Sequence, residues 1–390
     1  MLKLPPLTER IARLIGLGSV SSADPDLDQS NRPVIDQLAE WAETVGFQVE
    51  IDPVSDTKAN LIARLGGSLD AEAPGGLILS GHTDTVPCNP ELWQSDPWQA
   101  ALRDDRIYGL GACDMKGFFA VALEAARRFE GIQLQQPLIL IGTADEESSM
   151  SGARQLMHSG RRLGRRAIIG EPTGLRPIRM HKGVMMERIR VIGRSGHSSD
   201  PALGANALNG MAKVLNALID LQERLKEHYR HPGFEVDYPT LNLGAIRGGD
   251  NPNRICGCCE TAIDIRPLPG MSLESTRALL EETLNGLLPE STGLRLEIAS
   301  LFPGTPAFET PAEAELTRVL EDATGHSAGS VAFGTEGPFF SALGLETLIL
   351  GPGHIAQAHQ PNEYLALADI PPAVRVYESL IQKYCLTARH

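Results

Sequence analysis

The chain has few cysteines, no long apolar run and no block of lysine and arginine. Six cysteines in 390 residues are too sparse for a disulfide framework. No apolar run approaches the roughly 18 residues of a transmembrane helix, and the first residues, MLKLPPLTER, lack the apolar core of a secretory signal. These absences predict a protein of the reducing cytoplasm with no membrane-spanning segment, and apolar residues at 42% with charged residues at 22% predict that it is folded.

The charge balance is acidic. Aspartate and glutamate outnumber lysine and arginine, 49 against 35, which gives a formal net charge of −14. Because no basic block could follow a phosphate backbone, nucleic acid is not expected as a partner. An acidic surface favours the approach of cationic small molecules, but a surplus of acidic residues more often only keeps a protein soluble. The net charge therefore argues against a nucleic-acid partner but does not identify a small-molecule partner.

The length exceeds what one hydrophobic core usually serves, so two domains are expected. Apolar residues at three- and four-residue spacing predict amphipathic helices over 7–17 and 33–45. Further helices are predicted over 116–129, 151–160 and 313–324. Short apolar runs at 77–79, 138–141, 167–169 and 348–350 are typical of strands buried on both faces. This alternation predicts an α/β domain with a mostly parallel mixed sheet flanked by helices.

The pattern changes between residues 182 and 302. Strand-like and helical runs follow one another there in the order β-α-β-β-α-β, which is typical of a ferredoxin-like α+β fold. The alternating pattern then resumes. We therefore expect one domain formed by residues 1–181 and 303–390, with residues 182–302 inserted as a second domain.

Histidines and acidic residues follow the predicted strands. Because parallel strands bring their carboxyl ends to one edge of a sheet, these side chains are expected to meet there. Clustered carboxylates repel one another unless a cation or a proton lies between them, and imidazole with carboxylate suits Zn²⁺. Taken singly, each residue could be an ordinary strand-end or helix-capping group. The residues are His82, Asp84, Glu146, Glu147, Glu171, His354 and His359.

Local geometry suggests separate roles for neighbouring residues. In an extended chain, positions i and i+2 share a face, so Asp84 could hydrogen-bond the far imidazole nitrogen of His82. Adjacent residues of an extended chain point in opposite directions. In an extended Glu146-Glu147 pair, one carboxylate could bind the metal while the other acts as a general base.

Five motifs follow one another along the chain. They are GHTDTVP at 81–87, YGLG and DMKG within 108–117, DEE at 145–147, GEPT at 170–173 and AHQPNE at 358–363. Together they resemble the dinuclear zinc aminoacylase/carboxypeptidase family, and the resemblance covers nearly the whole chain. It implies a zinc-peptidase-like catalytic domain with an inserted lid and dimerisation domain, which agrees with the predicted organisation.

The resemblance also implies a set of metal ligands. His82 and Glu171 would hold one Zn²⁺, Glu147 and His359 the other, and Asp114 would bridge both. Glu146 would be the general base for attack of a bridging hydroxide on an amide carbonyl. Two Zn²⁺ per subunit are implied, with Co²⁺ able to occupy the same ligands. The peptide bond between Asp114 and Met115 would be cis, and His354 matches no ligand position.

Further residues are implied to contact the substrate. His197 matches a histidine that reaches the active site of the partner subunit and stabilises the oxyanion, which implies a homodimer. Arg266 matches an arginine that binds a substrate carboxylate, a task suited to its guanidinium geometry, and Asn253 would line the same region. Thr335 and Glu336 fall in a glycine-rich loop beside the substrate, where Glu336 could pair with a cationic substrate tail.

Three segments narrow the expected reaction. Residues 239–244, 253–260 and 264–270 resemble the branch of the family that hydrolyses N²-acetyl-L-ornithine to L-ornithine and acetate in arginine biosynthesis. Desuccinylation of succinyl-diaminopimelate, or deacylation of a broader range of N-acyl amino acids, is the alternative within the family. A non-catalytic binding protein with the same fold is the alternative from another class. Asn362 departs from the family pattern, because relatives often have Asp there.

Overall fold

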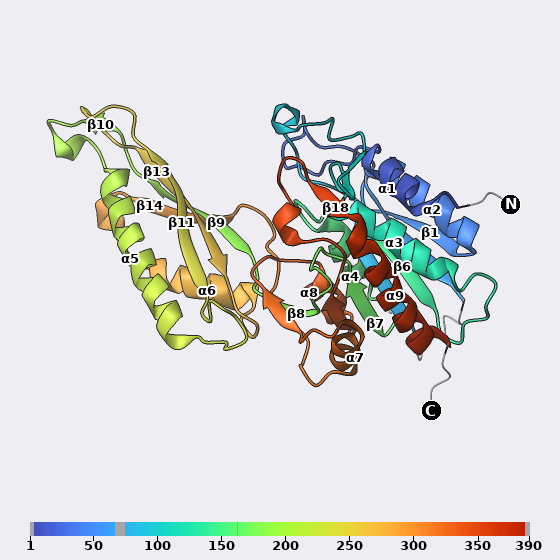
Figure 1. The fold of residues 1–390 in the computed structure, drawn as a ribbon. Helices are drawn as coiled ribbons and strands as arrows, with labels where there is room; N and C mark the ends of the chain where they lie inside the picture. Colours follow the sequence, from blue (N-terminus) through green and yellow to red (C-terminus); the bar gives the residue numbers. More distant parts are fainter. Residues whose placement is uncertain (1–3, 67–74, 162, 387–390) are drawn as a thin grey trace. The chain divides into compact units, whose positions relative to one another are not determined.

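The computed structural model describes residues 4–66, 75–161 and 163–386, and they form two compact units (Figure 1). The first unit comprises Met1–Arg179, Thr310–Gly329 and Thr335–His390, and the second comprises Met180–Glu309 and Ser330–Gly334. Each unit has its own hydrophobic core. The chain crosses between them more than once, so the second unit is an insertion into the first.

A nine-stranded mixed sheet forms the centre of the first unit. Its order is β1-β2-β6-β3-β7-β17-β8-β15, with β16 paired to β8. Strands β6, β3, β7 and β17 pair in parallel fashion, whereas the pairs β1-β2, β2-β6, β17-β8 and β8-β15 are antiparallel. The strands are β1 (Gln48–Pro53), β2 (Ala59–Leu65), β3 (Leu77–His82), β6 (Leu138–Thr143), β7 (Arg166–Ile169), β8 (Ile178–His181), β15 (Phe308–Glu309), β16 (Gly329–Val331) and β17 (Glu346–Ile349).

Helices flank this sheet and cover its apolar residues. Residues of α1, α2, α3 and α9 share one core cluster with β2, β3 and β6, while α4 and α8 contribute to a separate cluster. The α/β class predicted from the sequence is confirmed. The helices are α1 (Leu7–Ile15), α2 (Arg32–Val45), α3 (Lys116–Arg127), α4 (Ser151–Ser159), α7 (Glu315–Thr324), α8 (Gly337–Ala342) and α9 (Ile370–Ile381).

A small three-stranded sheet also belongs to the first unit. It pairs β4 (Ala101–Arg103) with β5 (Arg106–Tyr108), and β5 with β18 (Tyr364–Ala366), in antiparallel fashion. Because β5 precedes the loop that carries Asp114, and β18 follows the segment that carries His359, this sheet ties together two distant parts of the chain.

The second unit is an antiparallel four-stranded sheet with two helices. Its spatial order, β14-β9-β13-β11, is that of a ferredoxin-like fold, as predicted. On β13, buried residues alternate with half-buried ones, so one face contributes to the core. The elements are β9 (Met185–Ile192), α5 (Ala207–His228), β11 (Thr240–Gly248), β13 (Cys258–Arg266), α6 (Leu273–Leu284) and β14 (Arg295–Ser300).

The strand-like run of the sequence from residue 255 to 265 predicts one continuous strand of this unit, but in the structure this strand is interrupted. The run 255–265 is divided into β12 (Arg254–Ile255), which pairs with β10 (Gly196–His197), and β13, which begins at Cys258. The carbonyls of Cys256 and Gly257 accept hydrogen bonds from Ala207 and Gly193 instead of from a ladder partner. The apolar pattern alone does not reveal this change of partner.

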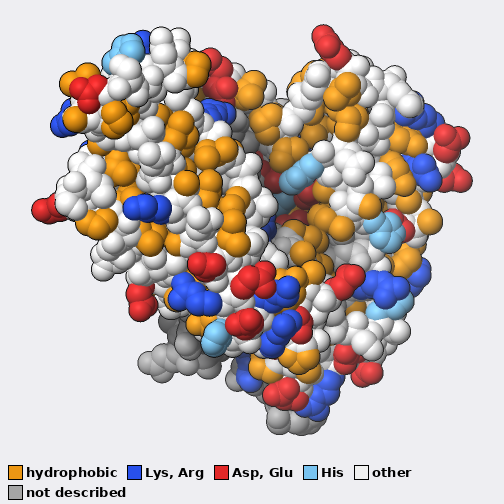
Figure 2. Space-filling view, turned by 90° about the vertical axis from the view of Figure 1, so that its left-hand side faces the viewer, with side chains coloured by type: hydrophobic (Ala, Val, Ile, Leu, Met, Phe, Trp, Pro, Cys, Tyr) orange, Lys and Arg blue, Asp and Glu red, His pale blue; other side chains and the backbone are white. Residues whose placement is uncertain are grey.

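The surface carries charges of both signs. On the face drawn in Figure 2, Lys and Arg side chains lie beside Asp and Glu along the lower part and the margins, and apolar side chains are spread among uncharged atoms elsewhere. Among the described residues, no helix combines the length and the apolar character needed to cross a membrane.

Candidate metal centre

The candidate ligands lie at the carboxyl ends of adjacent parallel strands. His82 is the last residue of β3, Glu146 and Glu147 follow β6, and Glu171 follows β7. Pairing of β3 with both neighbours brings these strand ends to the same edge. His359 comes from the segment after the 3-10 helix Ile355–Gln357. The sequence prediction that these distant residues converge therefore agrees with the geometry.

Helix α3 approaches this edge closely because two strand-end residues are glycines. A Cβ atom at Gly170 would lie 2.1 Å from the Phe118 ring, and one at Gly81 would lie 2.4 Å from Cε of Met115. A side chain at either position would therefore force Phe118 or Met115 to move, so glycine allows this close approach. Asp114 lies just before α3, at a peptide bond to Met115 that is cis, as the resemblance implied.

Asp114 lies between the two histidines. Its Oδ1 is 3.1 Å from Nε2 of His82, and its Oδ2 is 3.5 Å from Nε2 of His359. His359 Nε2 is also 3.1 Å from the carboxylate of Glu147. One carboxylate thus presents a different oxygen to each imidazole, which is the arrangement that a ligand shared by two cations requires.

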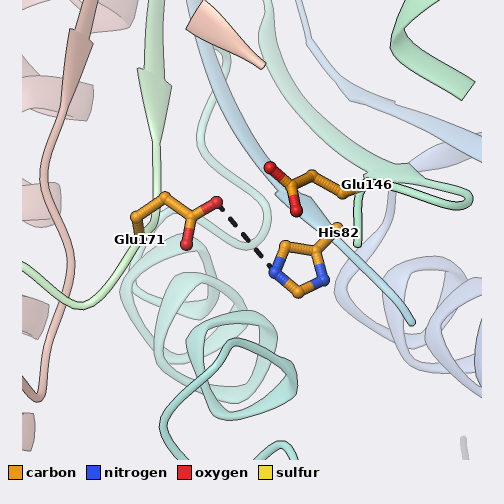
Figure 3. Close-up of side chains that lie close together, drawn as sticks. All are labelled: His82, Glu146 and Glu171. Carbon is orange, nitrogen blue, oxygen red and sulfur yellow. Dashed lines mark ion pairs between the residues drawn. The ribbon is translucent and has the colours of Figure 1, made fainter. Parts of the chain in front are cut away.

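Two groups of side chains in this cluster could each hold an ion. His82, Asp114 and Glu147 form one, and His82, Glu146 and Glu171 form the other, with ligand atoms within 4.8 Å of one another in each group. Figure 3 shows the second group, in which Glu146 and Glu171 approach the His82 ring from separate elements. The nearest oxygen of Glu171 is 4.0 Å from His82 Nε2.

Asp84 acts differently from the prediction. Nδ1 of His82 donates to the main-chain oxygen of Asp84 at 3.0 Å, while the Asp84 carboxylate is farther away, at 3.6 Å. This carboxylate instead accepts the main-chain N–H groups of Glu146 and Glu147, at 3.3 and 3.0 Å. Asp84 therefore positions both glutamates as well as the histidine.

The prediction of an extended Glu146-Glu147 pair is wrong, because both residues lie in a turn. Asp145 has a positive φ of 59°, and its main-chain oxygen accepts the N–H of Met150 at 2.6 Å. The turn still separates the two carboxylates, since Glu146 groups with Glu171 whereas Glu147 contacts His359.

Lys58 holds the turn that carries Glu146 and Glu147 through an ion pair with Asp145, a role that the sequence did not predict. Its buried ammonium lies 2.9 Å from the Asp145 carboxylate and 2.8 Å from that of Asp28. Ser21 and Ser151 each donate a hydroxyl hydrogen to Asp145 at 2.9 Å. Lys58 is far from every motif in sequence, so no local pattern could identify it.

The electrostatics of the cluster favour a cation. Burial and the nearby charge of Glu171 raise the pKa of Glu146 well above its ordinary value. Burial and the charge of Asp114 do the same for the pKa of Glu171. Burial also raises the pKa of Asp84 to about 6. Several acids in one buried space thus compete for positive charge.

The pKa values of the two histidines are also raised, which favours their charged forms. The hydrogen bond to Glu147 raises the pKa of His359 to about 9. Burial opposes protonation of His82, but the contacts with Asp114 and Glu171 prevail and raise its pKa well above the ordinary value. The carboxylates therefore stabilise positive charge where the ligand atoms converge. Imidazole nitrogens and carboxylate oxygens without a thiolate fit Zn²⁺ or a similar divalent ion.

Three predicted substrate residues lie in the second unit. His197 is exposed on β10, and its Nδ1 is 2.7 Å from the Ser199 hydroxyl. Arg266, at the end of β13, donates its Nε to Asp264 at 3.0 Å. Asn253 is exposed, and its main-chain oxygen accepts the N–H of Ser198.

The other predicted loop residues lie in the first unit. Thr335 and Glu336 are fully buried just before α8. Among the described residues, no hydrogen bond to either carboxylate oxygen of Glu336 has ordinary distance and angle, although the side chain of Thr143 is close enough to lower its pKa. Glu336 is close enough to His82 and Asp84 for their charges to act on it, and burial raises its pKa to about 7. His354 is exposed.

Comparison with known proteins identifies relatives over nearly the full length. Residues 78–383 match the model of peptidase family M20/M25/M40. The chain is 45% identical over 388 residues to an acetylornithine deacetylase of Photorhabdus laumondii, covering 99% of both chains.

Solved structures show the same fold at lower sequence identity. Aminopeptidase PepT of Bacillus cereus matches with a TM-score of 0.75 at 19% identity, covering 97% of both chains. The YxeP protein of Bacillus subtilis, a dinuclear metal-binding peptidase of the M20 family, matches with a TM-score of 0.66 at 14% identity, covering 96% of both chains.

Proposed function

The chain belongs to peptidase family M20/M25/M40, and from this membership we propose that it hydrolyses N²-acetyl-L-ornithine to L-ornithine and acetate. The observation that carries the proposal is 45% identity, over nearly the full length, to an acetylornithine deacetylase. The convergence of two histidines and four acidic residues at one sheet edge supports a hydrolytic centre. The reaction would be a step of arginine biosynthesis in the cytoplasm.

We assign the ligands of two Zn²⁺ ions as the sequence resemblance implies. His82 and Glu171 would hold one ion, Glu147 and His359 the other, and Asp114 would contact both. Its two oxygens facing different histidines support this assignment. When bound, such ions polarise a carbonyl group and lower the pKa of water towards neutrality.

Glu146 would move the proton in this reaction. Its carboxylate lies beside the assigned ligands His82 and Glu171, and its main-chain N–H is held by Asp84. A general base must be within hydrogen-bond reach of the proton it removes, and its pKa works best near the operating pH. Glu146 would take a proton from the attacking water and return it to the amine of the departing ornithine.

A substrate panel tests the proposed function. Zinc-loaded protein would be assayed for acetate release from N²-acetyl-L-ornithine and for succinate release from N-succinyl-diaminopimelate. We expect acetylornithine to give the higher kcat/KM. Preference for the succinyl substrate, or equal rates on many N-acyl amino acids, would contradict the assigned substrate while leaving the hydrolytic centre intact. No hydrolysis of any amide by zinc-loaded protein would favour a non-catalytic binding protein.

We also propose that Arg266 binds the α-carboxylate of the substrate and that Glu336 binds its side-chain ammonium. The Glu336 carboxylate is fully buried and accepts no hydrogen bond of ordinary geometry among the described residues, so a cation would compensate its burial. The Glu336→Gln variant is therefore expected to raise KM for acetylornithine about tenfold or more, because a charge-assisted hydrogen bond contributes about 1.5–3 kcal/mol. KM for N-acetyl-L-methionine, which lacks the ammonium, serves as the control and is expected to stay the same. An equal change for both substrates would contradict this role.

We propose that the protein is a homodimer in which His197 acts in the active site of the partner subunit. The exposed His197 and the edge strand β11, whose residues from Gly244 to Gly248 are largely exposed, support this proposal. Edge strands readily pair with another chain.

Mixing two inactive variants tests this arrangement. Refolded mixtures of His197→Ala and Glu146→Ala subunits are expected to regain activity, since each heterodimer would have one site with both an intact Glu146 and a donated His197. Each variant alone is the control. A mixture that stays inactive, although heterodimers are seen by native mass spectrometry, would place His197 in its own subunit.

A further inference from the structure

We propose that Glu363 is a positioning residue that fixes Asp114 between the two histidines, an inference that rests on the proposed metal centre. Its carboxylate is buried and accepts three main-chain N–H groups from the loop between β5 and α3. The distances are 3.1 Å from Gly111, 2.7 Å from Cys113 and 3.0 Å from Asp114. Glu363 therefore holds the backbone of the bridging aspartate itself.

The main-chain N–H groups of Gly111, Cys113 and Asp114 have no partner in a β-ladder, because the loop between β5 and α3 is irregular. Residues 109–115 lie outside helices and strands, and Gly111 has a positive φ of 79°. Buried N–H groups require acceptors, and several that point inward create a site for an anion. The Glu363 carboxylate fills this place from a segment distant in sequence.

The small sheet determines where Glu363 lies. Tyr364 of β18 pairs with Tyr108 of β5, with ring centroids 5.3 Å apart. One residue earlier, the main-chain oxygen of Glu363 accepts the N–H of Gly109 at 3.0 Å. Main chain and side chain of Glu363 thus hold the same loop at successive points.

The same segment carries a metal ligand. His359 lies four residues before Glu363, and Asn362 between them accepts the N–H of Gln94 at 2.8 Å. His359 Nε2 is 3.5 Å from Oδ2 of Asp114. Glu363 therefore links two assigned ligands that are far apart in sequence, and its loss would change their relative positions.

A carboxylate is required for this contact. Oε1 accepts from Cys113 and Asp114, while Oε2 accepts from Gly111. Glutamine would turn an NH₂ group towards at least one of these donors, so two donors would face each other. Aspartate would be shorter by one methylene group and could not reach the loop from the same backbone position.

The test compares Glu363→Gln with a matched buried substitution, Glu187→Gln. Glu187 is buried in the second unit, where it accepts the hydroxyl hydrogen of Ser300 at 3.1 Å and pairs with Arg277. Zinc affinity of the apoprotein would be measured by competition with a chromophoric chelator, and the absorption spectrum of the Co²⁺ form would be recorded. Melting temperatures would report stability separately.

We expect Glu363→Gln to bind zinc about 10- to 100-fold more weakly, as is typical when a group supporting a ligand is removed, and to change the Co²⁺ spectrum. Glu187→Gln is expected to keep zinc affinity within twofold, even if its melting temperature falls. Wild-type affinity and spectrum in folded Glu363→Gln would overturn the proposal. If that variant does not fold, Glu363→Asp is measured in the same way, and unchanged values there would overturn it. Wild-type protein that takes up no zinc would refute the metal centre itself.

Discussion

Replacing Glu146 by alanine is expected to lower kcat for acetylornithine by about 10²–10⁴-fold, which is the usual contribution of a general acid-base residue. Zinc content is expected to stay at the wild-type level. Glu146 lies within the same group of side chains as His82 and Glu171, so metal content must be measured together with activity. Steady-state kinetics and elemental analysis of the purified variant provide both values.

Glu147→Ala is the matched control for this experiment, because it removes the neighbouring carboxylate of the same turn. Glu147 contacts His359, so its loss is expected to reduce metal content as well as activity. A Glu146→Ala variant that loses metal would identify Glu146 as a ligand. One that retains wild-type turnover would remove it from the mechanism.

Removing the metal is expected to abolish hydrolysis and to lower stability. Chelation leaves the carboxylates of Asp114, Glu146 and Glu171 close together without a divalent cation. A metal ion that binds the folded state and not the unfolded state also increases the free energy of unfolding, and this contribution is lost with the metal. Zinc at about 1,000 times its dissociation constant would contribute about 4 kcal/mol. Activity and melting temperature would be measured for the dialysed apoprotein before and after zinc is restored.

His82→Ala is the control for metal removal, because it lacks a residue present in both candidate ion groups. Its activity is expected to be low from the start, and added zinc is expected to change its melting temperature less than that of the wild-type apoprotein. Full activity of a wild-type apoprotein that is shown to contain no zinc would contradict a metal-dependent mechanism of hydrolysis.

The convergence of the candidate ligands could be predicted because it depends on a regular feature of the fold. His82 ends a strand with an apolar run, Glu146 and Glu171 follow two others, and the parallel pairing of those strands brings their carboxyl ends to one edge. Neither step depends on loop conformation. The individual roles of the ligands came from the family resemblance and remain proposals.

The local details could not be predicted, because they depend on contacts between distant parts of the chain. The turn at Glu146 and Glu147 is fixed by Asp84 and by the buried ion pair of Lys58 with Asp145. The antiparallel hairpin of β1 and β2, at one side of the main sheet, also escaped prediction. On β2 all but one residue is buried, so the alternation that reveals half-buried strands is missing.

The spread of the ligands along the sequence has a consequence for how the protein acquires its metal. Glu147 and His359, which contact each other, are 212 positions apart, and the remaining ligands come from further separate segments. No short stretch of the unfolded chain contains a complete ion site, so free ligands in the nascent chain would capture zinc only weakly. Tight metal uptake must therefore follow the assembly of the parallel strands, and maturation of the enzyme becomes a late event in its biogenesis.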